Sequence, residues 1–139
     1  MPVKSTAARK RLVARSKILF SLFRAAPEAK AVFGFKPSQD VENHPMLRMG
    51  VLVHGARIVT MLDVVLSLLG PDIESFEEVL AQVGQRHVRM GVKKEHFCLL
   101  GDSIREVIAS IIGDEFTDED DEAWKEVFVL VTGTILMSM

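Results

Sequence analysis

The chain has 139 residues, 48 % of them hydrophobic, and a formal net charge of −2. This length and hydrophobicity suffice for one packed domain, residues 1–139, and exclude a disordered chain. The near-neutral charge gives no general electrostatic attraction to nucleic acid, so no nucleic-acid partner is expected.

Cysteine content and the length of apolar runs indicate the cellular location of the protein. The single cysteine, Cys98, cannot form an internal disulfide, and a cytoplasmic location is expected. Apolar runs such as residues 64–69 are too short to span a bilayer. Seven basic residues precede the first acidic one, Glu28, so mitochondrial or membrane-surface association is a minor alternative to a solvated basic face. These residues are Lys4, Arg9, Lys10, Arg11, Arg15, Lys17 and Arg24.

Helical periodicity runs through the whole chain. Apolar residues recur at three- and four-residue spacing in every long segment, and no segment reads as a strand. The pattern predicts a first helix over about residues 6–25, a short helical turn from Pro27 to Phe33, and a loop over residues 34–40. Pro45 is expected to open a long helix that ends at Gly70-Pro71.

The second half continues the helical pattern. A helix is expected from about Ser75, broken at Gly91, and another through Phe97 that ends at Gly113. Thr117 is expected to cap the last helix, whose first turn is acidic and therefore favoured by the helix dipole. The sequence thus predicts an all-α domain of about six helices with short connections.

Two histidines each lie in the apolar stripe of a different predicted helix. His54 lies in the apolar stripe of the long helix, and His87 lies near the end of the next one, 33 positions later. Each alone is more typical of an ordinary core histidine. Because a helix, a turn and a helix fill the gap, the two imidazoles can face each other across one apolar cavity, which suits a flat iron porphyrin.

Other uses of the residues are less favoured. Zinc needs three or four ligands, and the other histidines, His44 and His96, stand in polar stretches that are expected to be exposed. The acidic run over residues 114–122 lacks the spacing of a calcium-binding loop. No phosphate-binding loop or nucleophile motif is found. No reductase domain is fused to the chain, so sustained turnover would need an external electron donor, and a dedicated enzyme is not expected. A helical interaction module that binds no haem is the remaining alternative.

From Ser16 to its C-terminus the chain resembles the globins, of the single-domain, three-over-three, myoglobin-like type. The resemblance implies an all-α globin fold of six to eight helices that sandwich a haem. It also implies that the N-terminal helix is shortened or is continuous with the second. The matching segments are residues 18–28 with Phe33, His54-Gly55-Ala56 with Leu62, Gly84-Gln85-Arg86-His87, Gly91-Val92 with Phe97, and Ala123-Trp124.

The resemblance also implies roles for single residues around haem b. His87 is the proximal iron ligand, and a backbone carbonyl near Val83 is expected to hold its second nitrogen. His54 is the distal residue, and it is a direct ligand only if the iron is six-coordinate. Arg57 could reach a haem propionate or steady His54, and its combination with Leu19 and His54 is similar to cytoglobins and neuroglobins. The remaining haem contacts implied are Leu19 and Ile58 on the distal side, Phe33 stacked on the porphyrin, and Val83, Val92, Phe97, Leu100 and Ile104 on the proximal side and floor.

The activity implied by the resemblance is reversible binding of dioxygen, carbon monoxide or nitric oxide at ferrous iron, for transport, storage or sensing. A six-coordinate iron would instead favour electron transfer, redox signalling, or nitric oxide dioxygenase or nitrite reductase chemistry, with an external reductase. A homodimer is a further expectation. A second alignment, which sets Gly50 at the distal position, is less favoured than the one with His54.

Overall fold

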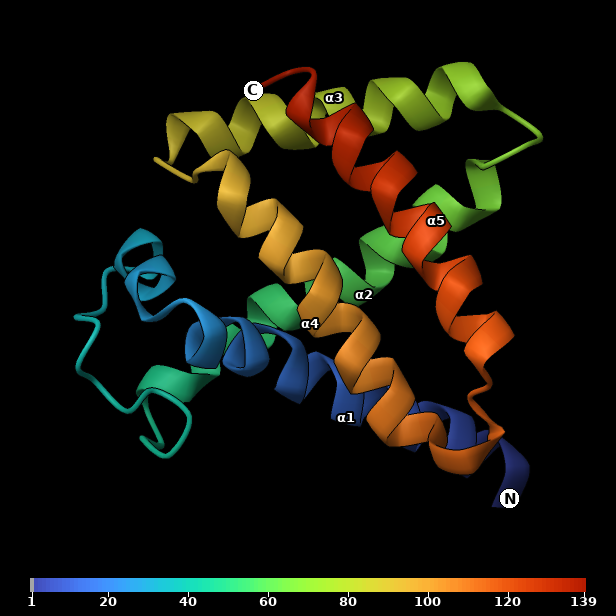
Figure 1. The fold of residues 1–139 in the computed structure, drawn as a ribbon. Coiled ribbons are helices and arrows are strands. Elements are labelled where there is room, and N and C mark those ends of the chain that lie inside the picture. Colours follow the sequence, from blue (N-terminus) through green and yellow to red (C-terminus); the bar gives the residue numbers. More distant parts are fainter. Residues whose placement is uncertain (1) are drawn as a thin grey trace.

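The computed structural model describes the backbone of residues 2–139, and the side chains of Lys10 and of residues 14–139. The described chain is helical and contains no strand (Figure 1), which confirms the all-α prediction. Its elements are α1 (Pro2–Ala25), the 3-10 helix η1 (Pro27–Phe33), α2 (Leu47–Leu68), α3 (Ile73–Arg89), α4 (Lys94–Ile112), the 3-10 helix η2 (Gly113–Glu115) and α5 (Asp118–Leu136).

The first helix is one continuous element. α1 runs for 24 residues without a break, so of the two arrangements expected at the N-terminus the structure has the continuous one. The side chains of Lys4, Arg9 and Arg11, in the predicted basic segment, lie outside the described residues.

The start of α2 differs from the predicted one. The helix begins at Leu47, and Pro45 lies in the turn before it. The Nδ1 atom of His44 accepts hydrogen bonds from the backbone N–H groups of Met46 and Leu47, each at 3.2 Å. An exposed imidazole therefore satisfies backbone donors that no carbonyl within the helix can reach.

Side-chain caps also begin α3 and α5. Asp72 accepts a hydrogen bond from the backbone N–H of Ser75 at 3.0 Å, and this contact is the main cause that lowers the pKa of the Asp72 carboxyl. At α5, Thr117 Oγ1 accepts from the N–H of Asp120, and Asp120 Oδ2 accepts from the N–H of Thr117, both at 3.1 Å. The predicted cap at Thr117 is confirmed and is a reciprocal capping box.

The helices enclose an interior space rather than one solid core. α1 packs against both α2 and α4, while α5 packs against α3 and α4 (Figure 1). Three clusters of buried side chains result, and Leu100 of α4 contacts all three of them. Ile58 of α2 contacts two. These two residues therefore lie where the clusters meet.

A glycine sets the approach of α2 to α1. Gly55 is buried, and a Cβ added to it would collide with the backbone carbonyl oxygen of Arg15. Only glycine lets two helix backbones come this close, so the crossing fixes α2 beside the position of His54.

The solvent face of α2 is unusually apolar. Met46, just before the helix, and Met49, Val53 and Val64 are all exposed there. By length and composition α2 could cross a membrane, which the short apolar runs in the sequence did not indicate. Its opposite face packs against α1 and carries the buried Val51, Gly55 and Val65.

Gly55→Ala should destabilise the protein by about 1–3 kcal/mol, because the methyl group has no room against the backbone of α1. Gly50→Ala is the matched control on the same helix, since a Cβ there meets nothing within 4 Å. It should stabilise by about 0.5–1 kcal/mol through helix propensity. Urea unfolding followed by circular dichroism measures both; equal effects of the two changes would refute the close crossing.

Candidate functional site

One cavity of about 410 Å³ lies among the five α-helices and η1. Its size is that of a small-molecule or cofactor site. Every residue that the sequence analysis assigned to the pocket lines it, on all sides of the space. These are Leu19, Phe33, His54, Arg57, Ile58, Val83, His87, Val92, Phe97, Leu100 and Ile104.

The cavity has further walls that the sequence analysis did not assign. The periodicity placed apolar residues on α5, but it could not show that this helix turns one face to the cavity. The additional lining residues are Leu22, Ala29, Val32, Met61, Leu62, Val65, Leu80, Arg86, Met90, His96, Gly101, Phe128, Val131, Thr132 and Ile135.

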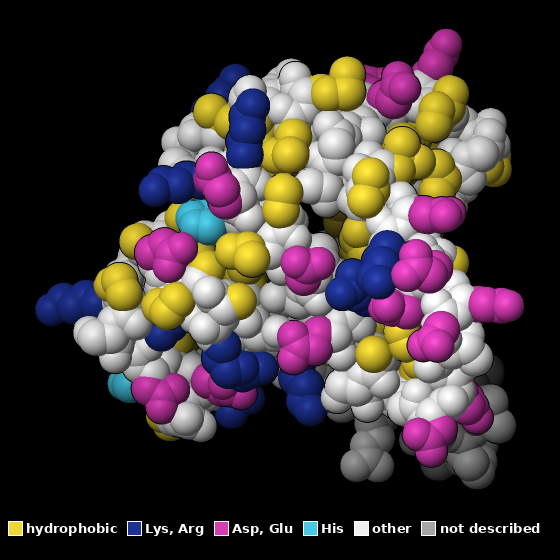
Figure 2. Space-filling view, in the orientation of Figure 1, with side chains coloured by type: hydrophobic (Ala, Val, Ile, Leu, Met, Phe, Trp, Pro, Cys, Tyr) yellow, Lys and Arg dark blue, Asp and Glu magenta, His cyan; other side chains and the backbone are white. Residues whose placement is uncertain are grey.

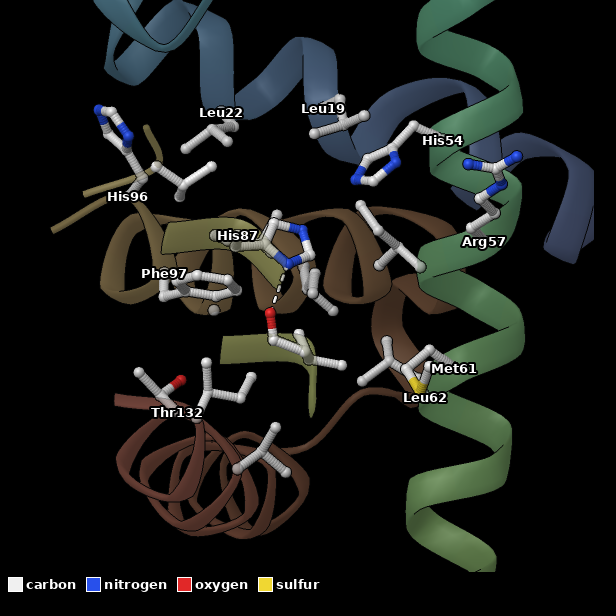
Figure 3. Close-up of a pocket in the computed structure, with 18 of the residues that line it drawn as sticks. Leu19, Leu22, His54, Arg57, Met61, Leu62, His87, His96, Phe97 and Thr132 are labelled. Atoms are coloured by element: carbon white, nitrogen blue, oxygen red, sulfur yellow. Dashed lines mark hydrogen bonds between the residues drawn. The ribbon is translucent and has the colours of Figure 1, made fainter. Parts of the chain in front are cut away.

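Two imidazoles face each other across the cavity. Figure 3 shows His54 on α2 and His87 on α3 turning their rings toward the same space, and their ring centroids are 6.1 Å apart. The Nδ1 atom of His87 lies 2.7 Å from the carbonyl oxygen of Val83, as the sequence predicted. Because a carbonyl can only accept, Nδ1 carries the proton and Nε2 keeps its lone pair for a metal.

Aromatic rings hold both imidazoles in place. Phe33 meets the ring of His54 edge-on at 5.4 Å, and Phe97 meets the ring of His87 edge-on at 5.2 Å. Phe33 is itself packed edge-on against Phe23, at 5.4 Å. Edge-to-face contacts of this kind favour one orientation of each ring, so both histidines are positioned before any ligand binds.

The protonation of His54 follows from its surroundings. Burial lowers the pKa of His54 from its usual 6.5, and electrostatic interactions with His87 and Arg57 lower it further. The ring is therefore neutral at neutral pH, and it can offer either a lone pair or an N–H to the cavity. Arg57 itself is exposed, and Figure 3 shows its side chain alongside α2 at the edge of the site.

The other two histidines differ in their exposure to solvent. His44 is exposed, as expected, and caps α2. His96 was expected to be exposed but is buried, because α4 begins against the cavity and turns this residue into its wall. Its Nδ1 atom accepts a long hydrogen bond of 3.4 Å from the backbone N–H of Lys93. Gly50 is exposed and does not line the cavity, so the geometry favours His54 over it as the distal position.

Comparison with known proteins identifies the family. The family model described as Globin matches residues 16–135. The chain is a globin. A neuroglobin of Tetraodon nigroviridis is 26 % identical over 127 residues, which cover 91 % of this chain and 79 % of that protein. A flavohemoprotein of Rhizobium meliloti (strain 1021) is also 26 % identical, over 77 % of this globin but only 24 % of its own length.

Solved structures agree on the fold. A hexacoordinated heme protein from an anhydrobiotic tardigrade superposes with a TM-score of 0.76 at 19 % identity, over 96 % of this globin and 86 % of that chain. The deoxy hemoglobin of Dasyatis akajei gives a TM-score of 0.69 at 19 % identity, over 94 % and 85 %. The globin fold expected from the sequence is thus confirmed.

Membership of the globins implies a haem cofactor, and the cavity fits one. Two imidazoles that bond one metal ion through nitrogen, at about 2.0 Å each, have ring centroids about 6 Å apart. The 6.1 Å between His54 and His87 matches that spacing. Around them the walls are largely apolar, from Leu19 and Ile58 to Phe97 and Leu100, as a flat hydrophobic macrocycle requires.

His87→Ala should abolish stable haem retention, because it removes the imidazole whose tautomer is fixed for metal binding. The loss should exceed the roughly 10–100-fold that removal of an outer-shell partner costs. Transfer of haem to an excess of apomyoglobin measures retention, and added imidazole should restore part of it. His44→Ala, which removes an exposed imidazole, is the control and should keep its haem. An unchanged haem content in His87→Ala would remove this residue from the proximal role.

Proposed function

We propose that this globin binds haem b, and that His54 and His87 both bond its iron when no other ligand is present. The observation that carries the proposal is the separation of 6.1 Å between the two rings. A distal histidine that only donates a hydrogen bond to a diatomic ligand must leave room for that ligand, so its ring would lie farther from that of His87.

Under this proposal each group of cavity residues has a separate role. Haem supplies a ferrous iron at which dioxygen, carbon monoxide or nitric oxide can bind reversibly. His87 holds the cofactor, oriented by its hydrogen bond to Val83. With haem bound, His54 would compete with the gas for the iron, and once it is free of the iron its N–H could donate a hydrogen bond to the gas. Leu19 and Ile58 keep water away from that side.

Competition by His54 favours sensing or redox chemistry over simple oxygen storage. A gas must first displace the imidazole, which lowers the apparent affinity by the fraction of protein in the open state. Similarity to neuroglobins and to a hexacoordinated heme protein supports this proposal.

A second candidate function is nitric oxide dioxygenation, favoured by the similarity to flavohemoproteins. This globin spans about a quarter of the length of the flavohemoprotein that it matches. Sustained turnover would need a donor of electrons to the haem, a task that a separate electron carrier could perform.

The absorption spectrum of the dithionite-reduced, haem-loaded protein tests six-coordination. The wild-type protein should give two sharp visible bands, and His54→Leu should give one broad band because the second nitrogen ligand is gone. Carbon monoxide should then bind the variant at least about tenfold faster, since no open state need form first. Arg57→Leu, a change at the rim, should keep the sharp bands. A single broad band in the wild-type protein would refute the proposal and leave His54 as a hydrogen-bond donor.

A further inference from the structure

The corner where α3 ends and α4 begins carries a basic and apolar surface. We call this surface, formed by Val88, Arg89, Met90, Lys93 and Lys94, the corner patch. All five residues are exposed, Met90 by 55 % and Val88 by 45 %. Figure 2 shows Lys and Arg side chains at the upper left, with an acidic side chain among them, while Asp and Glu side chains are more numerous along the right.

The cations of the corner patch are unpaired. Residues 79–94 include no aspartate or glutamate, although the protein as a whole has a net charge of −2. Arg89, Lys93 and Lys94 form no salt bridge with any side chain that the structure describes, and Glu95 is the one acidic neighbour in sequence. None of the three lines the cavity, so they stay available when a cofactor fills it. The patch is therefore a local positive field on an acidic protein.

Hydrogen bonds tie the corner patch directly to the proposed iron ligand. The carbonyl oxygen of His87 accepts from the backbone N–H groups of Met90 and Val92, both at 3.1 Å. Met90 is exposed on one side and lines the cavity on the other. A molecule docked on the patch would thus be separated from the His87 imidazole by one residue and one hydrogen bond.

We propose that the corner patch is the docking surface of an acidic protein that carries single electrons, and that this carrier reduces the iron of the proposed function. The reduced carrier loses one electron and ferric iron becomes ferrous, with no bond formed or broken. Val88 and Met90 give the apolar centre of the interface, and Arg89, Lys93 and Lys94 give the charged rim that an acidic surface complements.

The small size of the patch fits a transient partner. Five residues fall well short of the roughly 800 Å² per partner that stable assemblies bury, but encounters between redox proteins lie at the small end of that range. Such encounters depend on charge steering, which raises association rates when the two surfaces have opposite signs. Fast release suits a carrier that delivers one electron and leaves.

The test uses reduced flavodoxin, an acidic flavin protein, with the full haem-loaded chain. The double variant Lys93→Glu/Lys94→Glu should weaken flavodoxin binding and slow haem reduction at least about tenfold at low salt, with a smaller effect at high salt. The control variant Lys10→Glu/Lys17→Glu makes the same change of net charge at exposed positions of α1. It should change the affinity for flavodoxin and the rate of haem reduction by less than about twofold. Reduction by dithionite and the absorption spectrum should be the same in all three proteins.

Calorimetric titration of the haem-free protein with flavodoxin separates this proposal from the proposed function. If flavodoxin binding depends on Lys93 and Lys94 but the wild-type protein fails to retain haem when haem is added, the docking surface is supported and the haem role is refuted. Equal rates in wild-type and patch variants, or equal losses in both double variants, would overturn the docking surface. Self-association that Lys93→Glu/Lys94→Glu abolishes would assign the patch to a second copy instead, and would also overturn it.

Discussion

The candidate site of this globin depends on the spacing of two imidazoles, which lie tilted toward one another, 6.1 Å apart, in an apolar cavity. Both rings are only partly buried, and the Nδ1 atom of His87 is already held by the carbonyl oxygen of Val83. Two glycines set the spacing. Gly55, next to His54, lets α2 rest on the backbone of α1, and Gly84, three residues before His87, lies so close to α5 that an added Cβ would be 2.5 Å from the carbonyl oxygen of Ile135. Each histidine is therefore positioned by a backbone contact beside it.

Local patterns predicted the helices because helix formation depends on spacing within one turn. The same locality explains what the sequence could not show. Pro45 suggested the start of α2, but a hydrogen bond from the backbone to His44 moves it to Leu47. His96 stands beside Glu95 and so appeared exposed, yet the way α4 meets the cavity buries it. The spacing of 6.1 Å between His54 and His87 depends on how whole helices cross, which no periodicity contains. The resemblance to globins predicted that His54 and His87 lie in the same cavity, but it did not predict the distance between them.

The net charge of the chain does not predict the charge of its surface near the cavity, because many acidic side chains are paired and the nearby basic ones are not. Many acids lie at the start of α5, where Asp120 caps the helix and Asp121 accepts ion pairs from Arg105 at 3.0 Å and Lys125 at 3.3 Å. Charges paired in this way within one molecule contribute little to its outer field. The cations between α3 and α4 form no ion pair with the side chains that the structure describes, so a chain of net charge −2 still presents a positive surface beside the proposed iron ligand.

If His54 bonds the iron as proposed, a gas can bind only after His54 has left it, and the structure restricts how His54 can move. α2 has little room to move toward α1 at this point, since the backbone at Gly55 lies so near Arg15 that not even a Cβ atom would fit between them. Movement of α2 away from α1 would open the contacts of Val51, which is 1 % exposed, and cost buried apolar area. Rotation of the His54 side chain costs less, because the ring is only partly buried and its rotation gives up the edge contact with Phe33 without separating the two helices. Under the proposed function, we therefore expect ligand entry to depend on the orientation of the His54 imidazole against Phe33 rather than on movement of the helices.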